Sequence, residues 1–268
     1  MQPFFNIFGK NISSYAIMIF VAFIVCGSVF HLLTKKSILP LDKFLLAVYI
    51  FIGGIVGAKL LAMLVSLKLF TSLGNFNFML WVLNSGLVFY GGVIGGFLMG
   101  SLYIKLHGLS PKIVWKNVCI VLPLGSAIGR IGCFLNGCCY GQPTNSFLGV
   151  IFDNSPLLEI HGVKVHPTQL YEMVACTIIF IILLIVNKKE HNDYLVVFLY
   201  TVLYGTARFM IEFIRGDEQR GILLFISISQ IISLVIIMFG ALLYFSKLKN
   251  TYLFRQTPPI IKHSEIKK

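Results

Sequence analysis

Charged residues are scarce in this sequence. Only 12% of its 268 residues are Asp, Glu, Lys or Arg, and just 10 are acidic. Soluble domains carry about 25% charged residues, so this composition excludes an ordinary soluble protein. The chain is instead 57% hydrophobic. The sequence therefore predicts an all-α membrane protein, because helices satisfy their own backbone hydrogen bonds in lipid.

The motifs of several common enzyme classes are also missing. The sequence contains no Walker, GxGxxG, HExxH or GxSxG motif, which would mark nucleotide binding, a zinc site or a serine nucleophile. It has no long-period repeat. We predict neither a cofactor nor a metal.

Seven apolar runs are each long enough to span a bilayer, which takes about 17–20 residues. They cover residues 15–33, 44–65, 86–104, 118–135, 169–186, 194–214 and 223–245. We predict a single membrane catalytic domain over residues 1–245, with an amphipathic lead before the first run. Residues 246–268 should form a basic, disordered cytoplasmic tail.

The positions of the basic residues predict how the chain is oriented. Of the 22 Lys and Arg residues, 14 fall in connections and a tail on one side of the seven runs, five on the other side and three inside runs. Basic residues collect in the cytoplasm, so the N-terminus should lie outside and the C-terminus inside. The net charge of +12 is then a topology signal, and no nucleic-acid partner is expected.

Arg130 lies inside or at the edge of the fourth run. A charge at that depth costs about 2.5–3.5 kcal/mol and needs a partner or a water-filled cavity. Gly125, Gly129 and Gly132 would let a neighbouring helix or a lipid head group approach it. Arg130 could be a snorkelling anchor, but its surroundings favour an anion-binding residue that faces a polar cavity.

A second charged group lies at the end of the sixth run. Tyr204, Arg208, Glu212 and Arg215 are spaced four, four and three residues apart, which predicts one helical face. Arg208 and Glu212 could form a purely structural ion pair. We favour a charged cavity wall that complements Arg130.

Two further segments combine polar or small residues. His166 and Pro167 open the motif HPTQLYE, which either caps the fifth run or contributes to a site. Alternating residues before it predict a short hairpin. In the third run, Gly91 and Gly92 follow Tyr90, and these glycines either pack against another helix or leave room for a ligand.

Three cysteines, Cys133, Cys138 and Cys139, follow Arg130 closely. They could be inert packing residues, form a disulfide, or bind a metal or undergo redox chemistry. The sequence leaves these options open. Cys26, Cys119 and Cys176 lie in apolar runs and are expected in the core.

The ordered motifs resemble those of the prolipoprotein diacylglyceryl transferase family of bacterial membrane enzymes. In order, they are Tyr15 at the start of the first run, GGIVGAKL, the glycine-rich third run, GRIGCFLNG, HPTQLYE and YGTARFMIEFIR. The resemblance covers nearly the whole chain. It implies a multi-pass protein of the bacterial inner or plasma membrane.

The resemblance also implies an activity. The family transfers a diacylglyceryl group from phosphatidylglycerol to a lipobox cysteine in the signal-peptide region of a prolipoprotein, and releases glycerol phosphate. The partners would be these two substrates and membrane lipid. The predicted catalytic residues are Arg130, Arg208, His166, Glu212 and Tyr90. The predicted substrate-binding residues are Tyr15, Gly91, Gly92, Asn136, Gly141, Tyr171, Tyr204 and Arg215.

Three positions depart from the family's pattern. Tyr90 stands where the family usually has histidine, and Cys133 and Cys138 stand where it has asparagine and glutamate. The acceptor must react as a thiolate, and tyrosine is a poor base at neutral pH. His166, or Glu212 acting through a water, is therefore expected to take the proton.

Two other interpretations fit parts of the sequence. A non-catalytic lipid-binding or transport protein could use the same arginine-lined cavity. A membrane thiol oxidoreductase could instead be built on Cys133, Cys138 and Cys139.

Overall fold

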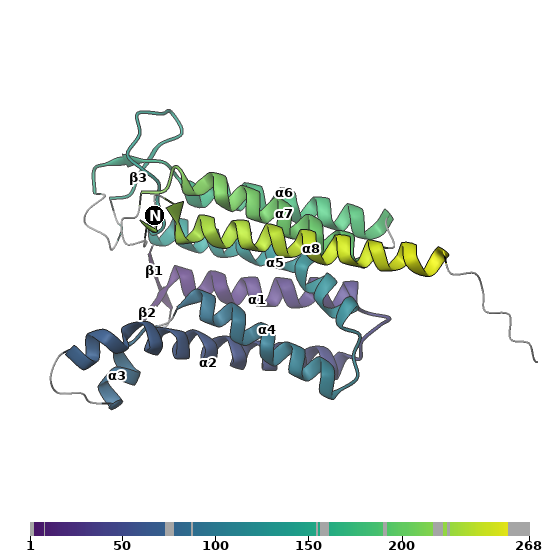
Figure 1. The fold of residues 1–268 in the computed structure, drawn as a ribbon. Helices are drawn as coiled ribbons and strands as arrows, with labels where there is room; N and C mark the ends of the chain where they lie inside the picture. Colours follow the sequence, from purple (N-terminus) through teal and green to yellow (C-terminus); the bar gives the residue numbers. More distant parts are fainter. Residues whose placement is uncertain are drawn as a thin grey trace, which may run out of the picture. The chain divides into compact units, whose positions relative to one another are not determined.

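The computed structural model describes residues 3–7, 9–72, 78–86, 88–153, 155, 161–189, 192–216, 222–223 and 226–256. Helices make up most of these residues, and the strands form three two-stranded antiparallel sheets. The predicted all-α class is thus confirmed. The elements in chain order (Figure 1) are β1 (Phe4–Ile7), β2 (Lys10–Ser13), α1 (Ser14–Leu33), α2 (Pro40–Ser72), α3 (Phe78–Asn84), α4 (Phe89–Leu106), α5 (Pro111–Asn136), β3 (Val150–Ile151), β4 (Lys164–Val165), α6 (Thr168–Lys189), α7 (Asp193–Glu212), β5 (Ile222–Leu223), β6 (Ile226–Ser227) and α8 (Ile228–Gln256).

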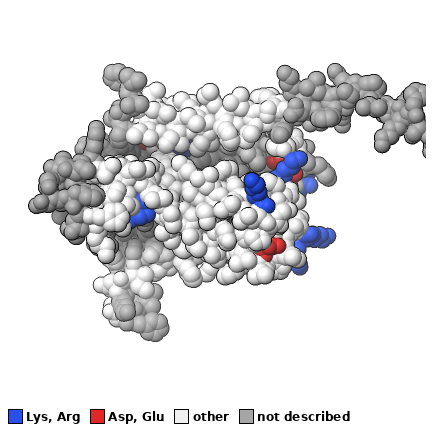
Figure 2. Space-filling model, turned by 60° about the horizontal axis from the view of Figure 1, so that its bottom comes forward, with Lys and Arg blue, Asp and Glu red and all other residues white. Residues whose placement is uncertain are grey.

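Six of the described helices are long and apolar enough to cross a membrane: α1, α2, α5, α6, α7 and α8. Helix α4, which covers the third predicted run, has 18 residues and is not among these six. Many large apolar side chains are exposed, among them Phe20 and Leu64, each about two-thirds accessible. On the face drawn in Figure 2, charged side chains are few and most of the described surface is uncharged. Such a surface suits contact with lipid rather than water.

Several element boundaries differ from the prediction. The N-terminal lead is a hairpin of β1 and β2. Helix α8 begins at Ile228 and not at Leu223, because Leu223 pairs with Ile226 in the β5–β6 hairpin. It continues to Gln256, so the start of the segment expected to be a disordered tail is helical. Residues 257–268 of that tail lie outside the described residues.

The described chain forms two compact units, residues 1–26 with 118–268, and residues 27–117. In the second unit, α2 packs against α4 through glycines. A side chain on Gly91 would overlap the Gly57 carbonyl, and one on Gly92 would approach the Gly54 carbonyl at 3.3 Å. The absence of side chains lets the two backbones touch. Gly91 and Gly92 thus fit the packing interpretation.

In the first unit, α7 packs against both α6 and α8, and α5 packs against the first turns of α1. A Cβ on Gly132 would lie 3.0 Å from the Met18 Cβ and 3.2 Å from the Tyr15 Cα. Gly125 makes a similar approach to the Cys26 sulfur at 3.1 Å. The glycines around Arg130 therefore accommodate helix α1, one of the two neighbours that the sequence allowed.

The connection between α5 and α6 folds on a small apolar core of its own. Tyr140, Phe152 and Val165 are buried there, with Phe134 packed against them. The predicted hairpin is confirmed, since β3 pairs antiparallel with β4. This folded connection, which follows Arg130 and precedes α6, positions the residues described next.

Candidate functional site

Arg130 forms an ion pair with Glu172 of α6. The Arg130 Nη2 atom lies 2.8 Å from the Glu172 Oε1 atom, and the glutamate side chain is only 4% exposed. A buried charge that loses its partner is strongly destabilising, so the two residues depend on each other. Glu172 was not among the predicted site residues. The signal that could have found it is the need of an intramembrane arginine for a partner.

Arg208 forms a second pair on α7. Its Nη2 atom lies 2.8 Å from the Glu212 Oε2 atom and donates a hydrogen bond to the Ser229 hydroxyl of α8 at 3.2 Å. Both charged side chains are buried, with 12% and 5% exposure. The predicted pairing of Arg208 with Glu212 is therefore present. The Arg208 Nη1 atom is also buried, and it has no hydrogen-bond partner among the described residues.

Tyr204 interacts electrostatically with residues of both ion pairs. It stands one turn before Arg208 on α7 and interacts through space with Glu172, Arg130 and Arg208. Tyr15 of α1 also lies within electrostatic range of Arg130. Helices α1, α5, α6 and α7 thus bring two guanidiniums, two carboxylates and two phenols into one neighbourhood.

The end of α7 differs from the prediction. The helix stops at Glu212, and Arg215 forms an isolated antiparallel bridge with Gly141. Arg215 is therefore not on the helical face that carries Tyr204, Arg208 and Glu212. The reason is backbone pairing: the Gln142 amide donates to the Ile214 carbonyl at 2.9 Å, which draws the chain out of the helix.

Gly141 is the point where three segments meet. Its amide donates to the His166 carbonyl at 2.8 Å, and the His166 amide donates to the Gln142 carbonyl at 3.1 Å. A side chain on Gly141 would approach the Cβ of His166 at 2.6 Å and the Ile214 carbonyl at 2.7 Å. Gly141 therefore holds the HPTQ segment and the end of α7 together.

His166 precedes α6, and its ring contacts a tyrosine in the first turn of that helix. Its Nδ1 atom lies 3.2 Å from the Tyr171 hydroxyl, and the ring is partly buried. This contact fixes the orientation of the imidazole. The structure thus brings His166 and Tyr171 together, two residues that the sequence placed in separate roles.

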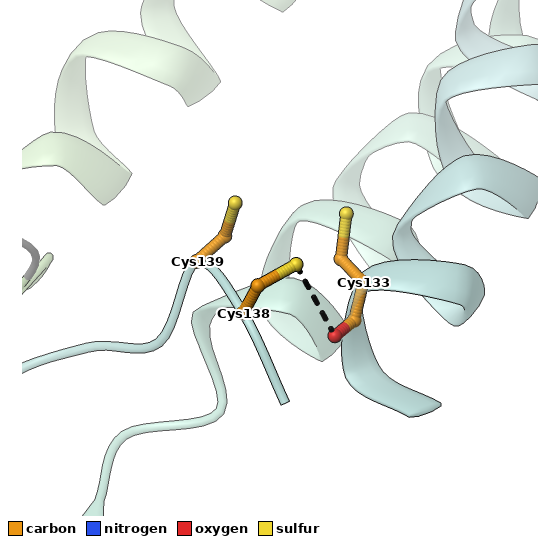
Figure 3. Close-up of side chains that lie close together, drawn as sticks. All are labelled: Cys133, Cys138 and Cys139. Atoms are coloured by element: carbon orange, nitrogen blue, oxygen red, sulfur yellow. Dashed lines mark hydrogen bonds between the residues drawn. The ribbon is translucent and has the colours of Figure 1, made fainter. Parts of the chain in front are cut away.

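The three cysteines form a cluster, which we call the cysteine trio. The sulfur atoms of Cys133, Cys138 and Cys139 all lie within 4.8 Å of one another, and all three thiols are free. Figure 3 shows Cys133 on the last turns of α5 and the other two on the segment that follows. Hydrogen bonds from the other two thiols and the charge of Arg215 lower the pKa of Cys139.

For the remaining predicted residues, the structure shows fewer contacts with the site. Asn136 ends α5 and its side chain interacts with Cys138. Tyr90 opens α4 in the unit of residues 27–117, together with Gly91 and Gly92. The substrate-binding and catalytic roles of these residues stay predictions.

The arrangement around Tyr204 suits the binding of an anion. Guanidiniums present planar N–H groups that match phosphate oxygens. Glu172 and Glu212 occupy one edge of each guanidinium, while the buried Arg208 Nη1 keeps a donor for a further acceptor. A donor in a buried site stabilises negative charge more strongly than it would in water.

Comparison with known proteins gives a consistent answer. The family model of prolipoprotein diacylglyceryl transferase matches residues 2–246. A phosphatidylglycerol–prolipoprotein diacylglyceryl transferase of Clostridium tetani is 36% identical over 249 residues, which cover 91% of this chain and 97% of that protein. A second, of Clostridium perfringens, is 34% identical over 252 residues, covering 91% and 95%. A third, of Clostridioides difficile, is 38% identical over 164 residues, covering 60% and 62%.

These matches agree with the transferase that the ordered motifs predicted. They give no support to the lipid-transport or thiol oxidoreductase alternatives.

Proposed function

Since this chain belongs to the prolipoprotein diacylglyceryl transferase family, we propose that it transfers a diacylglyceryl group to a prolipoprotein. The donor is phosphatidylglycerol and the acceptor is the thiol of a cysteine in the signal-peptide region. The names of the relatives supply both substrate classes. The protein is thus a transferase that acts on two membrane-associated substrates.

The reaction exchanges one bond for another. The acceptor sulfur attacks a glyceryl carbon of the donor, and the bond from that carbon to the phosphate oxygen breaks. A thioether forms, glycerol phosphate leaves as an anion, and the thiol proton passes to a base. The site must therefore stabilise a phosphate that gains charge and must accept one proton.

One observation carries this proposal: two largely buried arginine–glutamate pairs interact electrostatically with Tyr204, and one of their guanidinium nitrogens, Arg208 Nη1, has no partner among the described groups. We assign Arg208 and Arg130 to the departing phosphate. Glu212 and Glu172 orient these arginines and hold them in place through the two ion pairs.

We assign the proton transfer to His166. Its ring is held by Tyr171, and a neutral imidazole is the side chain best suited to accept a proton at neutral pH. Tyr90 then has a secondary part in catalysis. The residues proposed to contact substrate are Tyr15, Asn136, Gly141, Tyr171, Tyr204 and Arg215, whereas Gly91 and Gly92 pack against α2.

For the membrane topology we propose seven spans. Helix α4 is the additional span, because its 18 residues reach the lower limit for crossing the hydrocarbon core. The excess of basic residues on one side supports an outer N-terminus and a cytoplasmic C-terminus. The family is bacterial, and we place this protein in the inner or plasma membrane as a multi-pass enzyme.

The test is a transfer assay with purified protein in vesicles of phosphatidylglycerol and a lipobox peptide. We expect the peptide to gain the mass of one diacylglyceryl group and glycerol phosphate to be released. Vesicles of phosphatidylcholine, or a peptide with Cys→Ser at the acceptor, should give no product. An unmodified cysteine peptide in phosphatidylglycerol vesicles would contradict the proposed function.

A further inference from the structure

The cysteine trio has a geometry that the proposed reaction does not explain. Its three sulfur atoms come from one helix end and the turn behind it, and they lie within 4.8 Å of one another. Three sulfurs bound to one zinc ion at about 2.3 Å each would be about 3.8 Å apart. The cluster therefore needs to contract by only about 1 Å to surround such an ion.

The backbone of the turn is fixed by side chains from the first turn of α6. Thr168 donates to the Cys139 carbonyl, and Gln169 donates to the Cys138 carbonyl, each at 2.7 Å. Cys139 has a positive φ of 63°, a conformation that is unfavourable for a non-glycine residue and needs support from its surroundings. The Cys138 amide also bonds back to the Cys133 carbonyl at 3.1 Å. These contacts hold Cys138 and Cys139 beside Cys133.

The charges around the trio suit metal-bound thiolates. Arg215 interacts electrostatically with Cys139, and Arg130 does so with Cys133 and Cys139. Three thiolates and one divalent ion carry a net charge of −1, which the neighbouring guanidiniums offset. Thiolates are the ligands that zinc and related ions prefer.

We propose that Cys133, Cys138 and Cys139 bind a zinc-type ion as three thiolates and leave its fourth position to an incoming thiol. Binding releases the protons that the three thiols still hold. No fourth His, Cys, Asp or Glu atom joins the trio among the described residues. Zinc sites with three protein ligands and an exchangeable fourth position are the catalytic kind. The sequence left metal binding by these cysteines open without predicting it, and the clustering of the thiols favours it.

The fourth position of the ion would bind the acceptor cysteine of the transfer reaction, and this step rests on the proposed function. A thiol that coordinates such an ion loses its proton outright. The acceptor cysteine would therefore bind as a thiolate, beside the arginine that we assign to the phosphate, and its proton would pass to His166. Such activation would ease the demand on a side-chain base in a chain that carries Tyr90 where its family usually has histidine.

The first experiment measures metal in the purified full-length protein. After incubation with Zn²⁺ and dialysis we expect about one ion per chain, and each of Cys133→Ser, Cys138→Ser and Cys139→Ser should bind at least about tenfold more weakly. Cys119→Ala, on the same helix outside the trio, is the matched control and should keep the ion. Equal uptake by the wild type and the trio variants, or no uptake by the wild type, would overturn the site.

A second readout needs no variant. Zn²⁺ should protect three thiols of the wild-type protein from alkylation, as counted by mass. In the Co²⁺-loaded protein, a lipobox peptide should shift the visible d–d bands, and its Cys→Ser form should not. Unprotected thiols would overturn metal binding, and an unchanged spectrum would overturn acceptor coordination. None of these readouts depends on turnover, so the failure of either step is distinguishable from the failure of the proposed function.

Discussion

Arg130 and Glu172 are 42 positions apart in the chain, yet their side chains meet at 2.8 Å in a place where the glutamate is almost wholly buried. The pair joins α5 to α6. It supplies the partner that a deeply placed arginine requires. This contact connects two motifs that the sequence presents separately, and it defines one side of the candidate anion site.

Removing one member of this pair should cost more than removing both charges. Glu172→Ala leaves Arg130 buried without its partner and should destabilise the protein by about 3–5 kcal/mol. The double variant Arg130→Gln, Glu172→Gln should recover most of that loss while remaining inactive. Denaturant unfolding in detergent and the transfer assay measure the two effects. An active double variant would show that Arg130 serves structure alone.

The proton-transfer assignment predicts an order among four variants. His166→Ala should lose most activity, Tyr90→Phe should keep measurable activity, and Tyr90→His should be neutral or mildly activating. His166→Asn should stay poor, because an amide cannot replace the imidazole that contacts Tyr171 and is proposed to accept the proton. Rates on one lipobox peptide at several pH values decide the order. A dead Tyr90→Phe beside a healthy His166→Ala would reverse the assignment.

Gly141 tests whether the junction of three segments positions the site. Gly141→Ala places a methyl group 2.6 Å from the His166 Cβ, and relief of that overlap should cost about 1–3 kcal/mol of stability together with much of the activity. Gly27→Ala is the control, since a side chain there meets nothing within 4 Å. Thermal unfolding and turnover should separate the two variants. If both behave like the wild type, the junction is not a positioning element.

The proposed topology predicts where each terminus lies. A reporter fused after Lys268 should lie in the cytoplasm, and a reporter fused before Met1 should lie outside the cell. The cause is the excess of basic residues in the connections that we place inside. A C-terminal reporter that works outside the cell would remove one span from the topology, and α4 would be the first to reconsider.

Much of the fold could be predicted because it follows from local pattern. Apolar runs locate the helices, since bilayer thickness sets their length. The Arg208–Glu212 pair follows from helical spacing of four residues. The β3–β4 hairpin follows from alternation within a few residues. Each of these features depends on neighbours close in the sequence.

What could not be predicted depends on backbone pairing or on contacts between helices. Helical spacing placed Arg215 on the same face as Arg208, but α7 ends at Glu212 and Arg215 pairs with Gly141 instead. Glu172 appeared only as the last residue of the HPTQLYE motif, because no local rule joins α5 to α6. The cysteine trio was visible as a group, while its close geometry depends on Thr168 and Gln169 of α6.

We propose that buried guanidiniums stabilise the departing phosphate, and variants of Arg208 test this role most directly. Single-turnover rates in phosphatidylglycerol vesicles should fall about 10²–10³-fold for Arg208→Ala. Arg208→Lys should also be slow, because an ammonium lacks the planar fork. The control Lys35→Ala, exposed and distant in sequence, should react normally. Equal rates for Arg208→Ala and the wild type, with both proteins folded, would contradict the account.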